Sequence, residues 1–339
     1  MRVLLFATFA FLAGHLRAEE PFFKKGDVIA IVGGEDMVAL SEYGYLELLL
    51  TRALPDLHLR FRNLAWEGDT VFEQRRDLNF PTWEEALEKT GATVVIVQFG
   101  QMESVVGTVG FPKFTAAYAK LLERFSGGGK RRVVIVTPVV FPTPVFGQGL
   151  DETTQAEQLK EKLIIRRAWK PAFDRVRPIT DLAAGLRCRF VTLIPDLAEL
   201  CPTWPESVCR ATTRGDRLHL NDKGQQLTAI VIARALALQP TGDQTPQFKL
   251  SSSANYVLSR ASNDGDLLAT ITAKNRLWFD YWRVQNWAFL AGDRTNQPSS
   301  RDHLDPQKRW FPEERERFLP LIEAKEREID ALAAKLSAP

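Results

Sequence analysis

The sequence predicts an α/β protein: a three-layer α/β/α sandwich around a parallel sheet, of the flavodoxin-like kind, with a helical extension at the C-terminal end. Short apolar runs alternate with segments of helical spacing along residues 25–238, and the composition changes near Pro240. Strands that alternate with helices over this distance imply a parallel sheet with helices on both faces. In such sheets, functional sites form at the carboxyl ends of the strands.

Five segments have the character of strands. Residues 28–32 are continuously apolar and end at Gly33-Gly34, which is typical of a buried parallel strand that feeds a turn. Residues 57–64 instead alternate apolar and polar side chains. The other expected strands are residues 93–99, 133–136 and 189–194.

Helical spacing fills the intervals between these runs. The first expected helix, residues 40–53, is stopped by Pro55-Asp56. The next, residues 111–125, is closed by a serine and three glycines. Further helices are expected at residues 155–176 and 224–238.

Residues 239–339 are expected to form the helical extension. A polar stretch leads into an aromatic-rich segment, residues 275–287, and residues 312–335 have the pattern of a charged helix. The helical spacing of the aromatic residues favours a stripe packed against the main domain, and the alternative is a platform that stacks on sugars. These residues are Trp278, Phe279, Tyr281, Trp282, Trp287 and Phe289.

The first 18 residues have the succession of a secretory signal. Met1-Arg2 is positive, Val3 to Gly14 is apolar, and Ala18 precedes two glutamates. We therefore expect export to the periplasm or the extracellular space, the alternative being a first buried strand or helix. No later stretch approaches transmembrane length. The basic and acidic residues are interspersed and the net charge is only +2, which gives no reason to expect nucleic acid or an anionic membrane as partner.

Three cysteines fit an oxidising compartment. Cys201 and Cys209 flank a Pro-rich loop and could form a disulfide across it, which would leave Cys188 unpaired. Alternatively, Cys188 could pair with Cys201 or with Cys209. No second Cys pair or His cluster has the spacing of zinc ligands. There is no Gly-x-Gly-x-x-Gly and no Gly-Lys-Ser motif, so we expect neither a metal nor a nucleotide cofactor.

The tetrapeptide Asp216-Arg217-Leu218-His219 stands out in a chain with only four histidines. An Asp-x-x-His pair late in an α/β domain can place a carboxylate behind an imidazole, which leaves the far nitrogen free to act as a general base. Three other strand ends would face it: Gly33-Gly34-Glu35, Trp66-Glu67-Gly68 and Gly100-Gln101-Met102.

These four turns, in this order, resemble the four blocks of the SGNH/GDSL hydrolase family over roughly residues 25–238. The last block, Asp216 to His219, is the closest match. The resemblance implies ester hydrolysis with Asp216 and His219 as the base pair and Gly68 and Gly100 as oxyanion donors. The tail, residues 273–286, resembles the ends of long SGNH-like proteins from planctomycete-type bacteria.

Two defining residues of that family are replaced. Glu35 stands where the family has its nucleophilic serine, and Met102 stands where it has the asparagine that donates to the oxyanion. Losing a nucleophile can lower the rate about a million-fold, and losing one oxyanion donor typically lowers it about a hundred- to a thousand-fold. The sequence therefore argues against ordinary serine esterase chemistry. Trp66 and Met102 could line a ligand cleft, with an interior role for Trp66 as the alternative.

Three arrangements could still support chemistry at this site, and the alternative to all three is a plain ion pair. Glu35 could act as a carboxylate nucleophile or base with His219 assisting a water. Glu35, Asp216 and His219 could hold a metal, or Ser41 or Ser104 could supply a hydroxyl. The favoured interpretation is a Glu35–His219 ion pair without chemistry.

Two functions follow from the sequence. One is an exported hydrolase-like protein that acts on a small-molecule, carbohydrate or lipid ester. The other is a non-catalytic binding or scaffolding protein of the cell envelope, with residues 240–339 as a possible docking site for an envelope protein.

Overall fold

The computed structural model describes residues 21–103, 110–138, 189–191, 219–237 and 264–337. Its centre is a five-stranded sheet in the order β2-β1-β3-β4-β5, in which every neighbouring pair is parallel. The strands are β1 (Val28–Gly33), β2 (Arg60–Asn63), β3 (Val94–Gln98), β4 (Arg132–Val136) and β5 (Arg189–Val191). All five strands expected from the sequence are present.

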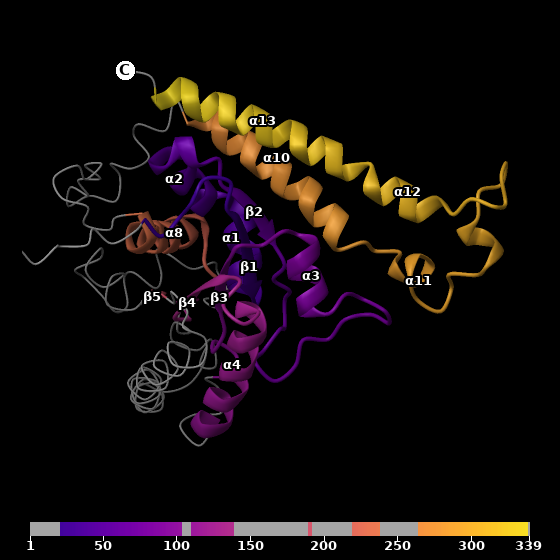
Figure 1. Cartoon of the computed structure of the whole chain (residues 1–339), viewed down its shortest axis with the longest axis horizontal. Coiled ribbons are helices and arrows are strands. Elements are labelled where there is room, and N and C mark those ends of the chain that lie inside the picture. Colours follow the sequence, from indigo (N-terminus) through magenta and orange to yellow (C-terminus); the bar gives the residue numbers. More distant parts are fainter. Residues whose placement is uncertain (1–20, 104–109, 139–188, 192–218, 238–263, 338–339) are drawn as a thin grey trace, which may run out of the picture.

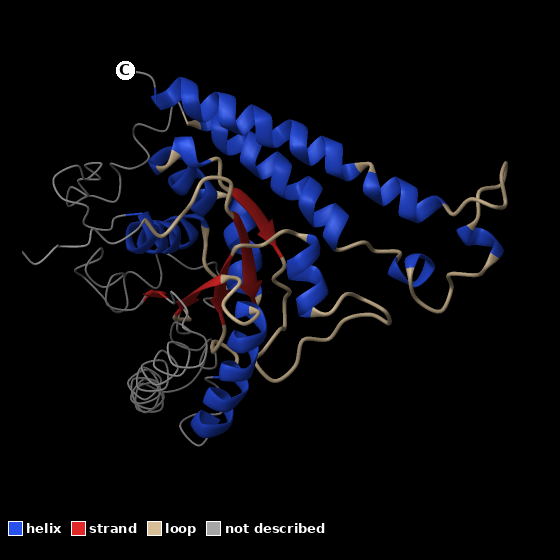
Figure 2. Cartoon of the chain, in the orientation of Figure 1, coloured by secondary structure: helices blue, strands red, loops and turns tan. Residues whose placement is uncertain are grey.

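Two hydrophobic clusters cover the two faces of the sheet. Because successive strand residues point to opposite faces, Ile29 and Ile31 of β1 belong to one cluster and Ala30 and Val32 to the other. The first cluster includes α1 (Glu35–Tyr43), α2 (Tyr45–Ala53) and α8 (Asp222–Ala237). The second includes α3 (Trp83–Lys89) and α4 (Phe111–Ser126). The three-layer sandwich is thereby confirmed, with red strands between blue helices in Figure 2.

The expected helix at residues 40–53 is wrong in its start and its continuity. The helix begins at Glu35 and is interrupted at Gly44. Gly44 has a φ of 72°, and it caps α1 by donating its N–H to the Leu40 carbonyl. This left-handed conformation favours glycine because other residues place a Cβ against the backbone there. An isolated Gly in an apolar helical run does not reveal such a break. Glu35 therefore lies in a first helical turn.

Helix α3 was not expected from the sequence. It has only seven residues, and its start carries a capping box in which the Thr82 side chain accepts from the Glu85 N–H while the Glu85 side chain accepts from the Thr82 N–H. The expected helices at 111–125 and 224–238 correspond to α4 and α8, whereas residues 155–176 lie outside the described residues.

Two long helices of the extension run along the β2 edge of the sheet (Figure 1). They are α10 (Gly265–Trp282) and α13 (Phe318–Ser337), and they contact each other along their lengths. Covering an edge strand in this way keeps its backbone from pairing with another chain. Shorter elements connect them: α11 (Trp287–Leu290), η4 (Pro298–Ser300) and α12 (Trp310–Glu316). The charged helix expected at 312–335 is therefore two helices.

The aromatic stripe of the extension is packed against the domain. Trp278, Tyr281 and Trp282 belong to the second core cluster and are 2–4% exposed. Trp278 also donates its indole N–H to the Asn63 carbonyl at 2.8 Å. Among the described helices, none has the length and apolar content that crossing a membrane requires.

Candidate functional site at the carboxyl end of β1

The turn after β1 places Glu35 at the carboxyl edge of the sheet. Gly33 has a φ of 150°, and a Cβ at this position would lie 2.4 Å from the Gln98 carbonyl oxygen of β3, so only glycine fits. Gly34 is the N-cap of α1, and Glu35 is the first helical residue. The carboxylate of Glu35 is favourable there because the helix N-terminus carries a partial positive charge.

His219, just before α8, meets Glu35 across this edge. Nε2 of His219 lies 2.9 Å from Oε1 of Glu35, and their side chains are 34% and 46% exposed. The structure therefore brings together two residues that the sequence singled out from distant parts of the chain. The contact has the geometry of the Glu35–His219 pair that the sequence analysis favoured, and it is an ion pair when His219 is protonated.

A third titratable group, Asp36, lies beside this pair and was missed by the sequence analysis. Its side chain is 7% exposed, and Oδ2 has no hydrogen-bond partner among the described residues. The pKa of Asp36 is raised to about 7, chiefly by burial and also by the neighbouring Glu35 charge, while His219 opposes the shift. An acidic residue after Glu35 is visible in the sequence, but its burial is not.

The two glycines expected to donate to an oxyanion are in different situations. Gly68 has a φ of 80° with open space where a Cβ would lie. The N–H of Gly100, by contrast, donates to Oε2 of Glu103 at 3.0 Å. Oε1 of Glu103 accepts from the Val71 N–H at 2.6 Å, so this buried carboxylate ties two strand-end loops together. The Gly100 N–H therefore already has an acceptor within the protein. The sequence analysis did not identify Glu103 as that acceptor.

Burial raises the pKa of Glu103, and its backbone hydrogen bonds oppose that shift. Met102, the residue before it, is 53% exposed. Its thioether offers only a weak acceptor, so it cannot replace an amide donor.

Trp66, expected as a ligand-binding residue, is surrounded by protein groups. The guanidinium carbons of Arg76 and Arg283 lie 4.5 and 4.2 Å from its ring centroid, and Phe80 meets its edge at 5.7 Å. Arg76 is held by a bidentate pair with the buried Asp69 at 2.6 and 2.7 Å. This arrangement is a cation–π stack that braces the loop carrying Gly68.

Several predicted site residues lie outside the described residues. They are Asp216, Ser104 and the three cysteines Cys188, Cys201 and Cys209. Ser41 lies in the second half of α1, as expected. Within the described ranges, no group of three or more His, Cys, Asp or Glu side chains could hold a metal ion.

No protein-family model matches the sequence, and no curated protein matches it. Solved structures do resemble it. A gut microbial diltiazem-metabolizing enzyme, BT4096, aligns over 92% of this chain and 95% of its own, with 12% identity and a TM-score of 0.52. This likeness extends over most of the chain, and it is one of fold.

Two further similar structures are described as hydrolases. A putative GDSL-like lipase from Parabacteroides merdae covers 64% of this chain and 98% of its own, at 15% identity and a TM-score of 0.38. A putative SGNH hydrolase from Slackia heliotrinireducens covers 62% and 98%, at 17% identity and a TM-score of 0.37. The similar structures thus include hydrolases of the SGNH/GDSL kind that the sequence resembles. The fold itself is a three-layer α/β sandwich on a parallel sheet, similar to the fold of BT4096.

Proposed function

We propose that this protein is a ligand-binding protein built on an SGNH-type hydrolase fold, which binds a small carbohydrate or lipid ester without serine esterase chemistry. The observation that carries the proposal is the 2.9 Å contact between Nε2 of His219 and Oε1 of Glu35. In a serine hydrolase, that imidazole nitrogen takes the proton of the nucleophilic hydroxyl. Here it faces a carboxylate, which has no proton to give when ionised.

The oxyanion side of the site supports the same conclusion. Because the Gly100 N–H already donates to Glu103, it is not directed at a substrate carbonyl, and Met102 has no donor to offer. A tetrahedral intermediate would therefore lack stabilisation that typically contributes about 2.7–4 kcal/mol for each donor. The half-exposed Glu35 carboxylate can still accept hydrogen bonds from ligand hydroxyl groups.

A second candidate is hydrolysis by an activated water, and Asp36 is the observation that favours it. A carboxyl with a pKa near 7 can give or take a proton at neutral pH, as general acid–base catalysis requires. In this alternative, Glu35 and His219 orient the water and Asp36 supplies the proton reservoir beside them.

Aryl-acetate hydrolysis by the purified mature chain separates the two candidates. For a binding protein, we expect turnover of 4-nitrophenyl acetate no higher than that of His219→Ala at equal concentration. Turnover that disappears in both His219→Ala and Asp36→Asn would instead establish the water mechanism. Binding is measured separately, by ligand-observed NMR with acetylated xylo-oligosaccharides, and the signal should weaken in Glu35→Ala.

The location belongs to the proposal as well. Residues 1–18 are proposed to be a signal peptide that directs the protein out of the cytoplasm, and Edman sequencing of the exported product should begin at Glu19. A product that retains Met1 in the cytoplasmic fraction would overturn this part.

The connection between α11 and α12 is the proposed docking region for an envelope partner. Leu304 in this connection is 82% exposed, and Trp310, the first residue of α12, is 39% exposed. A contiguous exposed apolar patch is typical of an interaction site. Cross-linking in envelope extract should yield an adduct with the native chain and none with Leu304→Asp. Equal adduct formation by both proteins would remove this assignment.

A further inference from the structure

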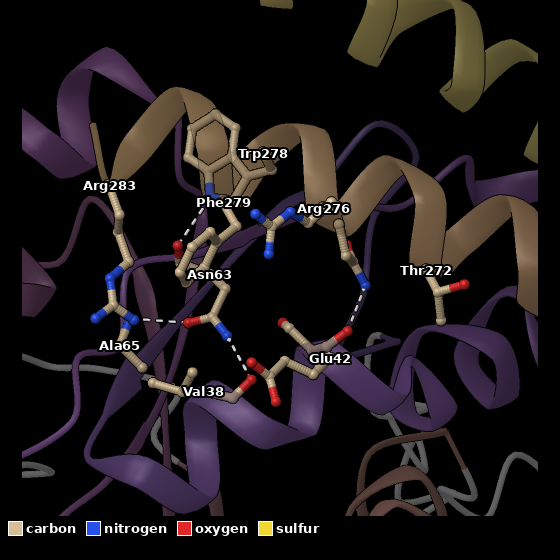
Figure 3. A pocket seen from close by; sticks show the side chains of 11 residues that line it. Val38, Glu42, Asn63, Ala65, Thr272, Arg276, Trp278, Phe279 and Arg283 are labelled. Carbon is tan, nitrogen blue, oxygen red and sulfur yellow. Dashed lines mark hydrogen bonds between the residues drawn. The ribbon is translucent and has the colours of Figure 1, made fainter. Parts of the chain in front are cut away.

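A pocket of about 260 Å³ lies between the sheet domain and the extension (Figure 3). One wall is α1, the opposite wall is α10, and the floor is the end of β2 with the chain just after it. The pocket is slightly smaller than the roughly 300–1,000 Å³ of sites for drug-sized ligands, so it suits a small metabolite. It exists only because α10 packs against α1, and it is separate from the Glu35–His219 pair.

The floor and inner wall of the pocket are largely apolar. Val38, Ala65 and Trp278 supply apolar surface. Asn63 does not offer its amide to a ligand, because Nδ2 donates to the Met37 and Val38 carbonyls and Oδ1 accepts from the Ala65 N–H. An apolar ligand body would therefore find a preformed surface here.

Opposite charges reach the pocket from its two walls (Figure 3). Glu42 extends from α1 and forms no ion pair with any described residue, including the two arginines of the facing wall. Arg276 extends from α10, where Asp280 pairs with it at 3.0 Å. Both arginines, Arg276 and Arg283, lie over the Phe279 ring, at 5.1 and 4.8 Å from its centroid. The ring thus orients both guanidinium groups beside the pocket.

Arg283 adds an unsatisfied donor to this wall. Its side chain is 14% exposed and pairs with Glu67, yet its Nη1 atom is buried without a hydrogen-bond partner among the described residues. A buried guanidinium nitrogen without an acceptor is unfavourable. Because this nitrogen is buried, an anionic ligand group at this wall would supply the missing acceptor only together with a small shift of the Arg283 side chain.

We propose that this pocket binds a small zwitterion: an α-amino acid with an apolar side chain. Its ammonium group pairs with Glu42, its carboxylate pairs with Arg276 and Arg283, and its side chain covers Val38 and Ala65. Charge-assisted hydrogen bonds at both ends bind more strongly than neutral ones. A ligand with only one charge makes a charged contact with one wall and none with the other, which gives the pocket its selectivity.

Isothermal titration calorimetry with L-leucine and L-phenylalanine tests the proposal on the full mature chain. We expect saturable binding, weakened at least about tenfold in Glu42→Gln and in Arg276→Gln because each removes one charged partner. Isoamylamine and 4-methylpentanoate, which each lack one charge of leucine, should bind at least about tenfold more weakly than leucine. Glu323→Gln and Arg327→Gln, exposed on α13, are the matched controls and should bind leucine like the native chain.

Three outcomes would overturn the proposal: no binding of either amino acid, binding unchanged in Glu42→Gln, or isoamylamine binding as tightly as leucine. Glucose serves as a neutral polyol, and tighter binding of glucose than of leucine would also overturn it. Since none of these substitutions touches Glu35 or His219, the result is independent of the function proposed for that pair.

Discussion

Nζ of Lys274 on α10 lies 2.8 Å from Oε2 of Glu47 on α2, and the two side chains are 0% and 6% exposed. Burial lowers the pKa of Lys274 and raises that of Glu47, so desolvation opposes the charges that their mutual attraction favours. The pair joins the extension to the sheet domain through the protein interior. The extension is therefore part of the folded core.

Removing one partner of this pair should be costly. Lys274→Met leaves Glu47 buried and unpaired, and breaking a buried ion pair in this way lowers the free energy of unfolding by about 3–5 kcal/mol. The double variant Lys274→Met with Glu47→Leu should recover most of that loss, because both charges are then gone. Urea unfolding followed by circular dichroism measures both, and a double variant no more stable than the single one would contradict the argument.

Gly44 should tolerate a side chain less well than another glycine of similar backbone conformation. Its Cβ would lie 3.0 Å from Ile271 and 3.2 Å from Thr272 of α10, whereas a Cβ at Gly128, with a φ of 69°, meets open space. Alanine costs about 1–2 kcal/mol at both positions through the backbone. Gly44→Ala should cost about 1–3 kcal/mol more through overpacking. Equal unfolding midpoints for the two variants would show that α10 shifts enough to accommodate the added methyl group at position 44.

Stability should depend on pH through Asp36. Its folded pKa of about 7 lies above the ordinary value of 3.8, so folding favours the protonated form. That contribution is fully present below the ordinary pKa and is lost as the pH rises through about 7. Between about pH 5 and pH 8, the native chain should therefore lose a few kcal/mol relative to Asp36→Asn. The control is Asp56→Asn, at an exposed position, whose stability should change with pH as that of the native chain does. If Asp36→Asn also shows the native pH dependence, Asp36 is not its source.

A serine introduced at position 35 should by itself give little esterase activity. Glu35→Ser supplies a hydroxyl next to His219, but the Gly100 N–H stays bonded to Glu103 and Met102 donates nothing. Adding Met102→Asn should then raise 4-nitrophenyl acetate turnover about a hundred- to a thousand-fold over Glu35→Ser, the usual effect of one oxyanion donor. Met102→Gln in the same background controls for amide placement. No gain with the asparagine would contradict the position assigned to residue 102.

The strands were predictable because their signal is local. A run such as residues 28–32 is apolar throughout since both faces of a parallel sheet are buried, and that requirement is written in consecutive residues. The position of Glu35 and His219 at strand ends could also be predicted, because parallel strands end at one edge of a sheet. The break at Gly44 could not, since the pattern on either side is equally helical.

The sequence by itself determined the alternation of strands and helices, the edge at which Glu35 and His219 lie, and the absence of a serine at the position of Glu35. Only the tertiary structure decided that Lys274 pairs with Glu47, that Glu103 engages the Gly100 N–H, and that Asp36 is buried enough to carry a raised pKa. The physical reason is that burial periodicity repeats every two to four residues, whereas hydrogen bonds and desolvation depend on groups that only the folded chain brings together.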